Sequence, residues 1–444
     1  MSKQELNFPT IVFLFFTVFT LFCQNVFSQP DSLSEKLREA ASLLQSNKLD
    51  EAEKDLRRIL KSAPASLDAH NLLGIVLDQK GNSAEAEREY SQALKIDPKA
   101  VSPLTNLGVL FARQKRYEEA AKTLEKVLKI KINHPQATVN LGFVYVSLGK
   151  YEKAVSLLQT AKQFEPDSYD ILFNLGLGLF RLSRFDEALS VFTSASKTNP
   201  EASETFYFLG LIAAEKDDSE SALANLEKAV ALRPTYAEAN FMIGEILRKN
   251  NRLQSAAEFY EKATLQNPSQ PVNYVRLGGV YLALGNLDKA LDIFTKAAVR
   301  FPKIPEIFYF IGITARGKGD FTTALTNLQK SLALKPDNPD ALALSGAILA
   351  DRSEIAEAEK LLRRAVNLDR NHFNAHYDLG RLLVRNSRFQ EALPILQRAA
   401  SIKPENPDVR YQLFLTLARL KRKPEADREL SLYKKLTAEL KNQK

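Results

Sequence analysis

Cysteine is almost absent from this sequence of 444 residues, and its absence excludes several kinds of chemistry. The single cysteine, Cys23, lies in an apolar N-terminal segment that we expect to be cleaved off. A mature chain without a thiol has no disulfide, no thiolate metal site and no cysteine nucleophile. The bulky Phe22 directly before Cys23 also argues against attachment of a lipid at this position.

Catalytic motifs are lacking as well. The sequence has no Gly-x-x-x-x-Gly-Lys-Ser/Thr phosphate loop, no His-Glu-x-x-His and no Gly-x-Ser-x-Gly. Among its four histidines, His372 and His376 have the i, i+4 spacing of metal ligands, but no third ligand stands near them. We interpret His70 and His376 as packing residues. The sequence therefore predicts a protein that is not an enzyme and that holds no cofactor and no metal ion.

Neither sign of charge dominates, since 61 Lys and Arg face 53 Asp and Glu. The excess of eight positive charges gathers toward the C-terminus, where residues 401–444 contain eleven Lys or Arg and six Asp or Glu. We interpret its densest part, Lys421 to Lys423, as a solvated turn; the alternative is a contact for an acidic partner or anionic lipid head groups. Because no long basic face interleaved with aromatic residues occurs, we expect no nucleic-acid partner.

Residues 1–30 differ in composition from everything that follows. Ile11 to Phe22 is interrupted only by two threonines, which is shorter than the roughly 20 apolar residues of a membrane span and suits a secretory leader. We predict a signal peptide over 1–28, a linker over 29–32, and export to the bacterial periplasm or cell envelope. The alternatives are an inner-membrane anchor over 9–27, with membrane association through the N-terminus, and a wrongly assigned start codon.

What the chain does contain is a unit that recurs every 34 residues. From Tyr169 to Ala202, apolar residues at three- and four-residue steps predict two short amphipathic helices that meet at Gly176 and Ala188. Glycine recurs in phase at Gly74, Gly108, Gly142, Gly176, Gly210, Gly244, Gly278, Gly312, Gly346 and Gly380. Alanine recurs in phase at Ala86, Ala120, Ala154, Ala188, Ala222, Ala256, Ala290, Ala324, Ala358 and Ala392. Proline stops most of the second helices, at Pro98, Pro166, Pro200, Pro234, Pro268, Pro302, Pro336 and Pro404.

A helix–turn–helix period of 34 residues with these three markers resembles the tetratricopeptide repeat (TPR) family. The resemblance implies an all-α fold, a right-handed superhelical solenoid of about twelve repeats in which each repeat packs on its neighbours. We place an atypical first repeat at 33–66, ten regular units at 67–406, a capping repeat at 407–440 and a tail at 441–444. We expect no separate domain beside the repeats.

The resemblance also implies that the first helix of each repeat lines a concave groove. The sixth position of that helix, two residues before the glycine, is Asn106, Asn140 and Asn174 in three consecutive repeats. Side-chain amides both donate and accept, so they can hold an extended peptide backbone without reading its sequence. This run resembles the asparagine ladder in the TPR region of O-GlcNAc transferases, although no glycosyltransferase domain follows. The alternative is that these asparagines, which we expect to face water, only hydrate the helix surface.

Apolar and aromatic side chains surround this run on the expected groove. We predict that they form a binding surface for a partner and not a packed core; they are Phe143, Phe173, Phe180, Tyr207 and Phe241. Farther along, Arg248 and Arg316 make the groove basic, and we expect Glu204, Glu238 and Glu306 to be their counter-charges. No repeat combines Lys at the fifth with Asn at the ninth position, as the family's carboxylate clamp for chaperones requires, so a chaperone co-factor is disfavoured.

These observations predict an exported scaffold whose groove binds an extended peptide or a helix of another protein. One alternative is a regulatory or targeting subunit of a glycosyltransferase or of a cell-envelope polymer-export assembly. The other is a solenoid that assembles with copies of itself. The sequence leaves the identity of the partner and the oligomeric state open.

Overall fold

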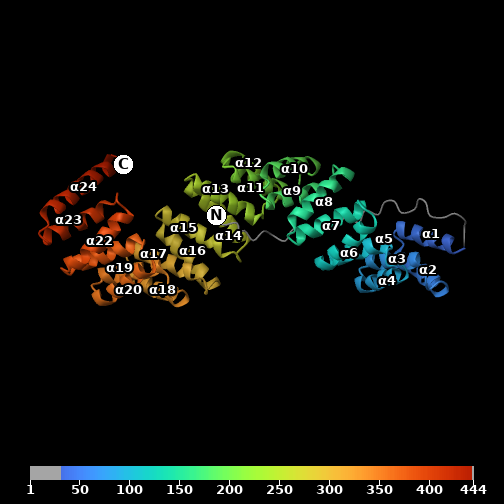
Figure 1. The fold of residues 1–444 in the computed structure, drawn as a ribbon, viewed down its shortest axis with the longest axis horizontal. Coiled ribbons are helices and arrows are strands. Elements are labelled where there is room, and N and C mark those ends of the chain that lie inside the picture. The colour runs from blue at the N-terminus through green and yellow to red at the C-terminus, as the bar shows by residue number, and fades with distance from the viewer. Residues whose placement is uncertain (1–31, 443–444) are drawn as a thin grey trace. The chain divides into compact units, whose positions relative to one another are not determined.

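The computed structural model describes residues 32–442, so the signal peptide predicted over 1–28 lies outside the described residues. The described chain consists of 24 α-helices and contains no β-strand (Figure 1). This confirms the all-α repeat solenoid. None of the described helices is both long and apolar enough to cross a lipid bilayer.

The helices fall into two compact units, which divide between Pro234 and Thr235. The first unit contains α1 (Ser32–Gln45), α2 (Leu49–Ser62), α3 (Leu67–Gln79), α4 (Ser83–Ile96), α5 (Val101–Arg113), α6 (Tyr117–Ile130), α7 (Pro135–Ser147), α8 (Tyr151–Phe164), α9 (Tyr169–Arg181), α10 (Phe185–Thr198), α11 (Ser203–Glu215) and α12 (Ser219–Leu232). The second unit contains α13 (Ala237–Lys249), α14 (Leu253–Gln266), α15 (Pro271–Ala283), α16 (Leu287–Arg300), α17 (Pro305–Gly317), α18 (Phe321–Leu334), α19 (Pro339–Asp351), α20 (Ile355–Leu368), α21 (Phe373–Arg385), α22 (Phe389–Ile402), α23 (Pro407–Arg419) and α24 (Lys423–Asn442).

Each helix pair is held together at its small residues. Gly176 of α9 lies so close to α10 that a Cβ atom added to it would be 2.9 Å from the ring of Phe192. The facing Ala188 is fully buried. The predicted close approach at Gly176 and Ala188 is thus confirmed, and the same glycine-to-side-chain contact recurs in the other regular repeats, as between Gly278 and Phe294. Packing at this density leaves no room for even one methyl group.

A left-handed residue turns the chain between the two helices of every repeat. In the pair α9–α10 it is Ser183, whose φ is 59°, and the amide of the next residue donates to the carbonyl of Leu179. This is the Schellman arrangement, which satisfies carbonyls at the end of a helix. The same turn position has positive φ throughout, at Asn47, Gly81, Lys115, Gly149, Ser183, Asp217, Asn251, Gly285, Gly319, Ser353, Ser387 and Lys421.

First helices of successive repeats lie next to one another over several repeats of each unit. In the first unit α5 contacts α7, α7 contacts α9 and α9 contacts α11; in the second, α17 contacts α19, α19 contacts α21 and α21 contacts α23. The described second helices make no comparably extensive contacts among themselves. Over these helices each unit therefore presents an inner face made of first helices. We define the inner face of any repeat as positions 2, 5, 6, 9, 12 and 13 of its first helix.

Candidate functional site

The asparagine run is aligned on the inner face of the first unit, but its amides are not free in water. Asn140 and Asn174 are only 3% and 6% exposed, whereas Asn106 is partly exposed. The expectation that all three face water is therefore wrong for Asn140 and Asn174. Their Nδ2 groups donate to backbone carbonyls one turn back, those of Gln136 and Asp170, each at 2.8 Å.

Asn106 connects to the preceding repeat. Its Nδ2 donates to Oδ1 of Asn71 at 3.1 Å, and the amide of Asn71 in turn donates to Ser102 at 3.2 Å. The three predicted asparagines thus share a helix position but do not share one kind of bond. Asn71 lies one position earlier on its own helix, out of phase with the run, so the 34-residue spacing did not predict it.

The amide oxygen of Asn174 is buried and has no hydrogen-bond partner among the described residues, while the nitrogen of the same amide donates to the carbonyl of Asp170. Burial also raises the pKa of the Asp170 carboxyl. A buried acceptor without a donor costs about 1–3 kcal/mol, so a donor that reached this oxygen would remove that cost.

The aromatic residues predicted to bind a partner largely pack on each other. Phe173 is 5% exposed and its ring centroid lies 5.7 Å from those of Tyr169 and Phe192 and 5.8 Å from that of Phe208. Phe208 stacks on Phe192 at 5.2 Å with nearly parallel planes. The expectation that Phe173 belongs to a surface and not to a core is therefore wrong, because rings from α10 and α11 enclose it.

The other predicted apolar residues divide in the same way. Phe143 and Tyr207 in the first unit and Phe241 in the second are buried, at no more than 8% exposure. Phe180 stays partly exposed and lies edge-on to Phe208 and Phe185, at 5.4 and 5.6 Å. Of the five, Phe180 alone keeps a substantial part of its ring accessible. The roles of all five in binding a partner stay predictions.

Arg248 lies on the inner face of the second unit beside a buried carboxylate. Its Nη2 is 3.1 Å from Glu245, which is 7% exposed and also receives Arg276 at 2.8 Å and the Tyr260 hydroxyl at 2.5 Å. Burial by itself would raise the pKa of Glu245, but the Tyr260 hydroxyl and the two guanidinium groups lower it overall. Glu245 is therefore the counter-charge of Arg248, and it was missed although it precedes Arg248 by three residues.

One expected counter-charge, Glu204, has another partner, and the basic Arg316 pairs with an acid that was not expected. Glu204 pairs with Arg233 at 2.7 Å within the first unit, and Arg316 approaches Asp351 at 4.0 Å. Asp351 is also approached by Arg381 and Arg385, which were not among the predicted site residues. The sequence contains a pattern that could have predicted this cluster. Its three arginines and Asp351 all occupy positions 9, 12 or 13 of their first helices.

The histidines agree with a packing role. His376 is 4% exposed, its Nδ1 lies 3.0 Å from the His372 carbonyl oxygen, and burial lowers its pKa. His70 is half-buried, with Nδ1 2.6 Å from Glu89. His372 lies 3.0 Å from Asp340. No group of three residues able to hold a metal ion occurs in residues 32–442.

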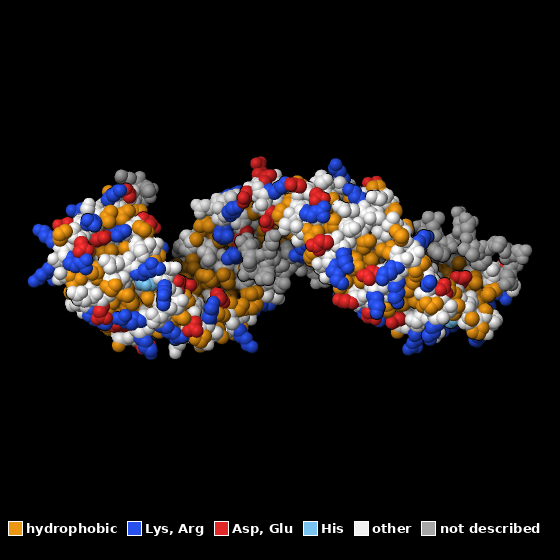
Figure 2. All heavy atoms as spheres, viewed as in Figure 1, with side chains coloured by type: hydrophobic (Ala, Val, Ile, Leu, Met, Phe, Trp, Pro, Cys, Tyr) orange, Lys and Arg blue, Asp and Glu red, His pale blue; other side chains and the backbone are white. Residues whose placement is uncertain are grey.

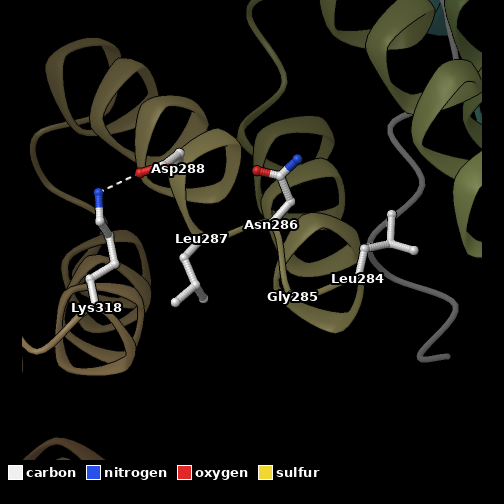
Figure 3. A pocket seen from close by; sticks show the side chains of 6 residues that line it. All are labelled: Leu284, Gly285, Asn286, Leu287, Asp288 and Lys318. Atoms are coloured by element: carbon white, nitrogen blue, oxygen red, sulfur yellow. Dashed lines mark hydrogen bonds and ion pairs between the residues drawn. The ribbon is translucent and has the colours of Figure 1, made fainter.

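A shallow hollow lies at the turn between α15 and α16 (Figure 3). Its polar groups are already engaged: Lys318 binds Asp288 at 2.5 Å, and Asn286 accepts the amide of Lys289 at 3.2 Å. The hollow is therefore a feature of the turn and not a candidate site. On the face seen in Figure 2, basic and acidic side chains are interspersed over both units, with apolar side chains between them.

The comparisons with known proteins point to one family along the chain. Tetratricopeptide repeat models match residues 37–101, 79–138, 111–174 and 173–224. The model described as the C-terminal domain of cilia and flagella-associated protein 70 matches residues 211–443, just over half of the chain. No curated protein is significantly similar to the sequence.

Several solved structures are similar in fold. YrrB, described as a TPR protein with an unusual peptide-binding site, is 25% identical, with 41% of this chain and 95% of that chain covered and a TM-score of 0.40. The Cut9–Hcn1 structure is 14% identical over 93% of this chain and 94% of that chain, with a TM-score of 0.45. Pseudomonas aeruginosa pilF is 21% identical over 48% of this chain and 97% of that chain, with a TM-score of 0.43.

Proposed function

Because the chain belongs to the tetratricopeptide repeat family, we propose that it is a protein–protein interaction scaffold without catalytic activity of its own. Its inner face binds an extended peptide or a helix of a partner protein. The adjacency of the first helices supports this proposal, because it gives residues 101–215 and residues 305–419 each a surface to which several repeats contribute.

The observation that carries the proposal is the unpartnered amide oxygen of Asn174. A peptide backbone supplies N–H donors at regular intervals, and one such donor removes the cost of this buried acceptor once the side chains that cover the oxygen move aside. The amide cannot rotate freely to find another partner, since its nitrogen is held by the Asp170 carbonyl. The acceptor is therefore oriented before the partner arrives, which lowers the entropy lost on binding.

A cluster of packed aromatic rings, which we call the ring cluster, lies beneath the same face. Phe173, Phe192 and Phe208 join α9, α10 and α11 into one packed body. At its edge Phe180 offers a partly exposed ring, and aromatic anchors of this kind dominate the energy of many interfaces. Asn174 orients the partner and Phe180 anchors it.

The test compares two sets of asparagine variants. The first replaces Asn106, Asn140 and Asn174 with alanine. The control replaces Asn225 and Asn327, which lie on second helices and make the same bond to a carbonyl one turn back, at 2.8 and 2.9 Å. Proteins crosslinked to the tagged full chain in the native cell envelope are identified by mass spectrometry, and the affinity of each is then measured.

We expect each inner asparagine to contribute about 0.5–1.5 kcal/mol to binding, so that the inner variant loses at least about tenfold in affinity. The control variant should bind like the wild type. Thermal melting of both variants separates lost binding from lost folding. A partner that binds the inner variant and the wild type equally well would place the site elsewhere.

Export is a separate part of the proposal. A leader ending at Ser28 places the mature N-terminus at Gln29 or within a few residues of it. The intact mass of the protein recovered from the envelope measures this directly. Retention of Met1 would instead favour an anchor over residues 9–27.

A further inference from the structure

Three arginines from the inner face of the second unit converge on one carboxylate. Arg381 Nη2 lies 3.1 Å from Asp351 Oδ1, Arg385 Nη1 lies 3.8 Å from the same oxygen, and Arg316 Nη2 lies 4.0 Å from Oδ2. The arginines come from α17 and α21, and Asp351 ends α19, which lies between them in the chain. Three consecutive repeats thus contribute to one cluster.

The cluster is accessible and carries an excess of positive charge. The side chains of Arg316, Arg381 and Arg385 are 39%, 28% and 47% exposed, and that of Asp351 is 33% exposed. The other carboxylate nearby is Asp378, which is 14% exposed and lies 3.4 Å from Arg381. Three guanidinium groups therefore face two carboxylates.

The arginines also have spare hydrogen-bonding capacity. Each guanidinium carries five N–H donors in a planar fork. Arg381 uses one of its nitrogens for Asp351, and Arg385 donates to the carbonyl of Ala350 at 3.3 Å. Arg316 is at ion-pair distance and not at hydrogen-bond distance from Asp351. An incoming carboxylate could take bidentate bonds that Asp351, fixed at the end of α19, does not complete.

We propose that this arginine cluster binds the side-chain carboxylates of an acidic segment in a partner protein, and that Asp351 occupies the position of one such carboxylate until the partner arrives. The inference rests on the proposed function in taking the ligand to be a polypeptide. It adds a second binding site, in a different unit from Asn174. It also specifies that the ligand groups at this second site are carboxylates. Asp351 acts as an internal competitor that keeps the guanidinium groups oriented.

The fixed carboxylates favour an acidic polypeptide over a nucleic acid. Asp351 and Asp378 stand among the arginines and would repel the closely spaced phosphates of a strand. A peptide can space its carboxylates to meet the guanidinium groups and avoid the two aspartates. Free inorganic phosphate shares the anionic chemistry, so the experiment must separate it from a peptide.

The test measures binding of a fluorescent peptide of alternating glutamate and glycine to the full chain by anisotropy, beside the same peptide with glutamine in place of glutamate. We expect binding of the glutamate peptide alone. The variant R316Q/R381Q/R385Q should weaken it at least tenfold. The control R300Q/R364Q/R398Q removes the same charge from second helices of this unit and should change it less than twofold. If both variants lost the same amount of affinity for the glutamate peptide, the loss would be explained by net charge alone and the proposal would be overturned.

Asp351→Asn tests the competitor role. Removing the internal carboxylate should tighten binding of the glutamate peptide at least threefold, whereas weaker binding would overturn that role. Oligouridine that binds more tightly than the peptide through the same arginines, or millimolar phosphate that displaces the peptide completely, would overturn the assignment to an acidic polypeptide.

These results are distinguishable from failure of the proposed function. A chain that ignores the glutamate peptide but still loses its captured partner on replacement of Asn106, Asn140 and Asn174 refutes this inference alone. A chain that binds the peptide through its arginines, but whose captured partner is indifferent to those asparagines, refutes only the site proposed in the first unit.

Discussion

The inner face over residues 101–215 and the inner face over residues 305–419 use the same helix framework for different chemistry. In the first, amides and rings pack tightly, and Phe173 is enclosed by Phe192 and Phe208. In the second, guanidinium and carboxylate groups such as Arg381 and Asp351 stay partly exposed. The contact that holds a repeat together, glycine against the side chain sixteen residues later, is the same in both. The glycine contact within each repeat therefore determines how the helices pack. The side chains on the inner face can vary between buried apolar groups and partly exposed charged groups.

The largest effect should come from the ring cluster. Phe173→Ala opens a cavity between α9, α10 and α11 and should lower the free energy of unfolding by about 3–5 kcal/mol. Arg381→Gln, on the hydrated face, should cost less than about 1 kcal/mol because its ion pair is partly exposed. Urea unfolding of both variants measures the contrast. A Phe173→Ala chain as stable as Arg381→Gln would remove the distinction between the two faces.

The next effect concerns pH. Burial raises the pKa of Asp378 to about 6, while Arg381 and Arg316 lower it in part and Asp351 raises it further. The folded chain then binds more protons than the unfolded chain between about pH 4 and 6, so this group makes stability fall as pH rises through that window. Asp378→Asn should remove the dependence and stabilise the chain at pH 7 by up to about 2 kcal/mol.

Chemical unfolding at pH 4, 5, 6 and 7 checks this sign. Asp337→Asn is the matched control, because the Asp337 side chain is 71% exposed and does not contribute to the raised pKa of Asp378. A stability difference between Asp378→Asn and wild type that is the same at pH 4 and pH 7 would contradict the burial of an ionisable group on this face.

A smaller effect is expected from the amide of Asn174 on the inner face of the first unit. Asn174→Leu replaces an amide whose oxygen lacks a partner with an apolar group of similar size, so folding stability should stay equal or rise by up to about 1 kcal/mol. Partner binding should nevertheless weaken, because the oriented acceptor is lost. Melting temperature and affinity are measured on one preparation. Loss of stability without loss of affinity would assign Asn174 to the fold and not to the site.

The smallest effect lies in the second helices. Pro394 is the one proline inside α22, where it removes a backbone donor and crowds the carbonyl of Gln390. The helix nevertheless extends over Phe389–Ile402, the same length as α10. We expect faster amide exchange around Pro394 than in the matching turn of α10, residues 190–193. Equal protection at both places would show that the proline leaves its helix as stable as the others.

The fold was predictable because three small or rigid residues mark the same points in each repeat. Gly176, Ala188 and Pro200 specify where helices meet and stop, and these are local properties of sequence. The burial of Phe173 was not predictable in this way, since the rings that enclose it come from α10 and from the next repeat. In the sequence, Phe208 occupies the position after Asn174 at which the asparagine run ends. In the structure, its ring packs against Phe173 and Phe192.

The partners of the arginines were missed for a geometric reason. The expected counter-charges Glu238 and Glu306 occupy the second position of their first helices, whereas Arg248 and Arg316 occupy the twelfth. Ten residues along a helix separate such groups by about 15 Å. Carboxylates at positions 9 and 13, Glu245 and Asp351, lie at the correct end of the helices and make the ion pairs.

The residues with positive φ at the turns between helices should make some repeats less stable than others. Glycine adopts positive φ without penalty at Gly81, Gly149, Gly285 and Gly319, whereas a residue with a Cβ atom, such as Lys115 or Ser183, costs roughly 1 kcal/mol there. Since a repeat array opens locally and unzips along its length, we expect the repeats with these costly turns to open more readily than their neighbours with glycine. Replacing such residues with glycine, one turn at a time, would move the weak points along the chain without touching either inner face.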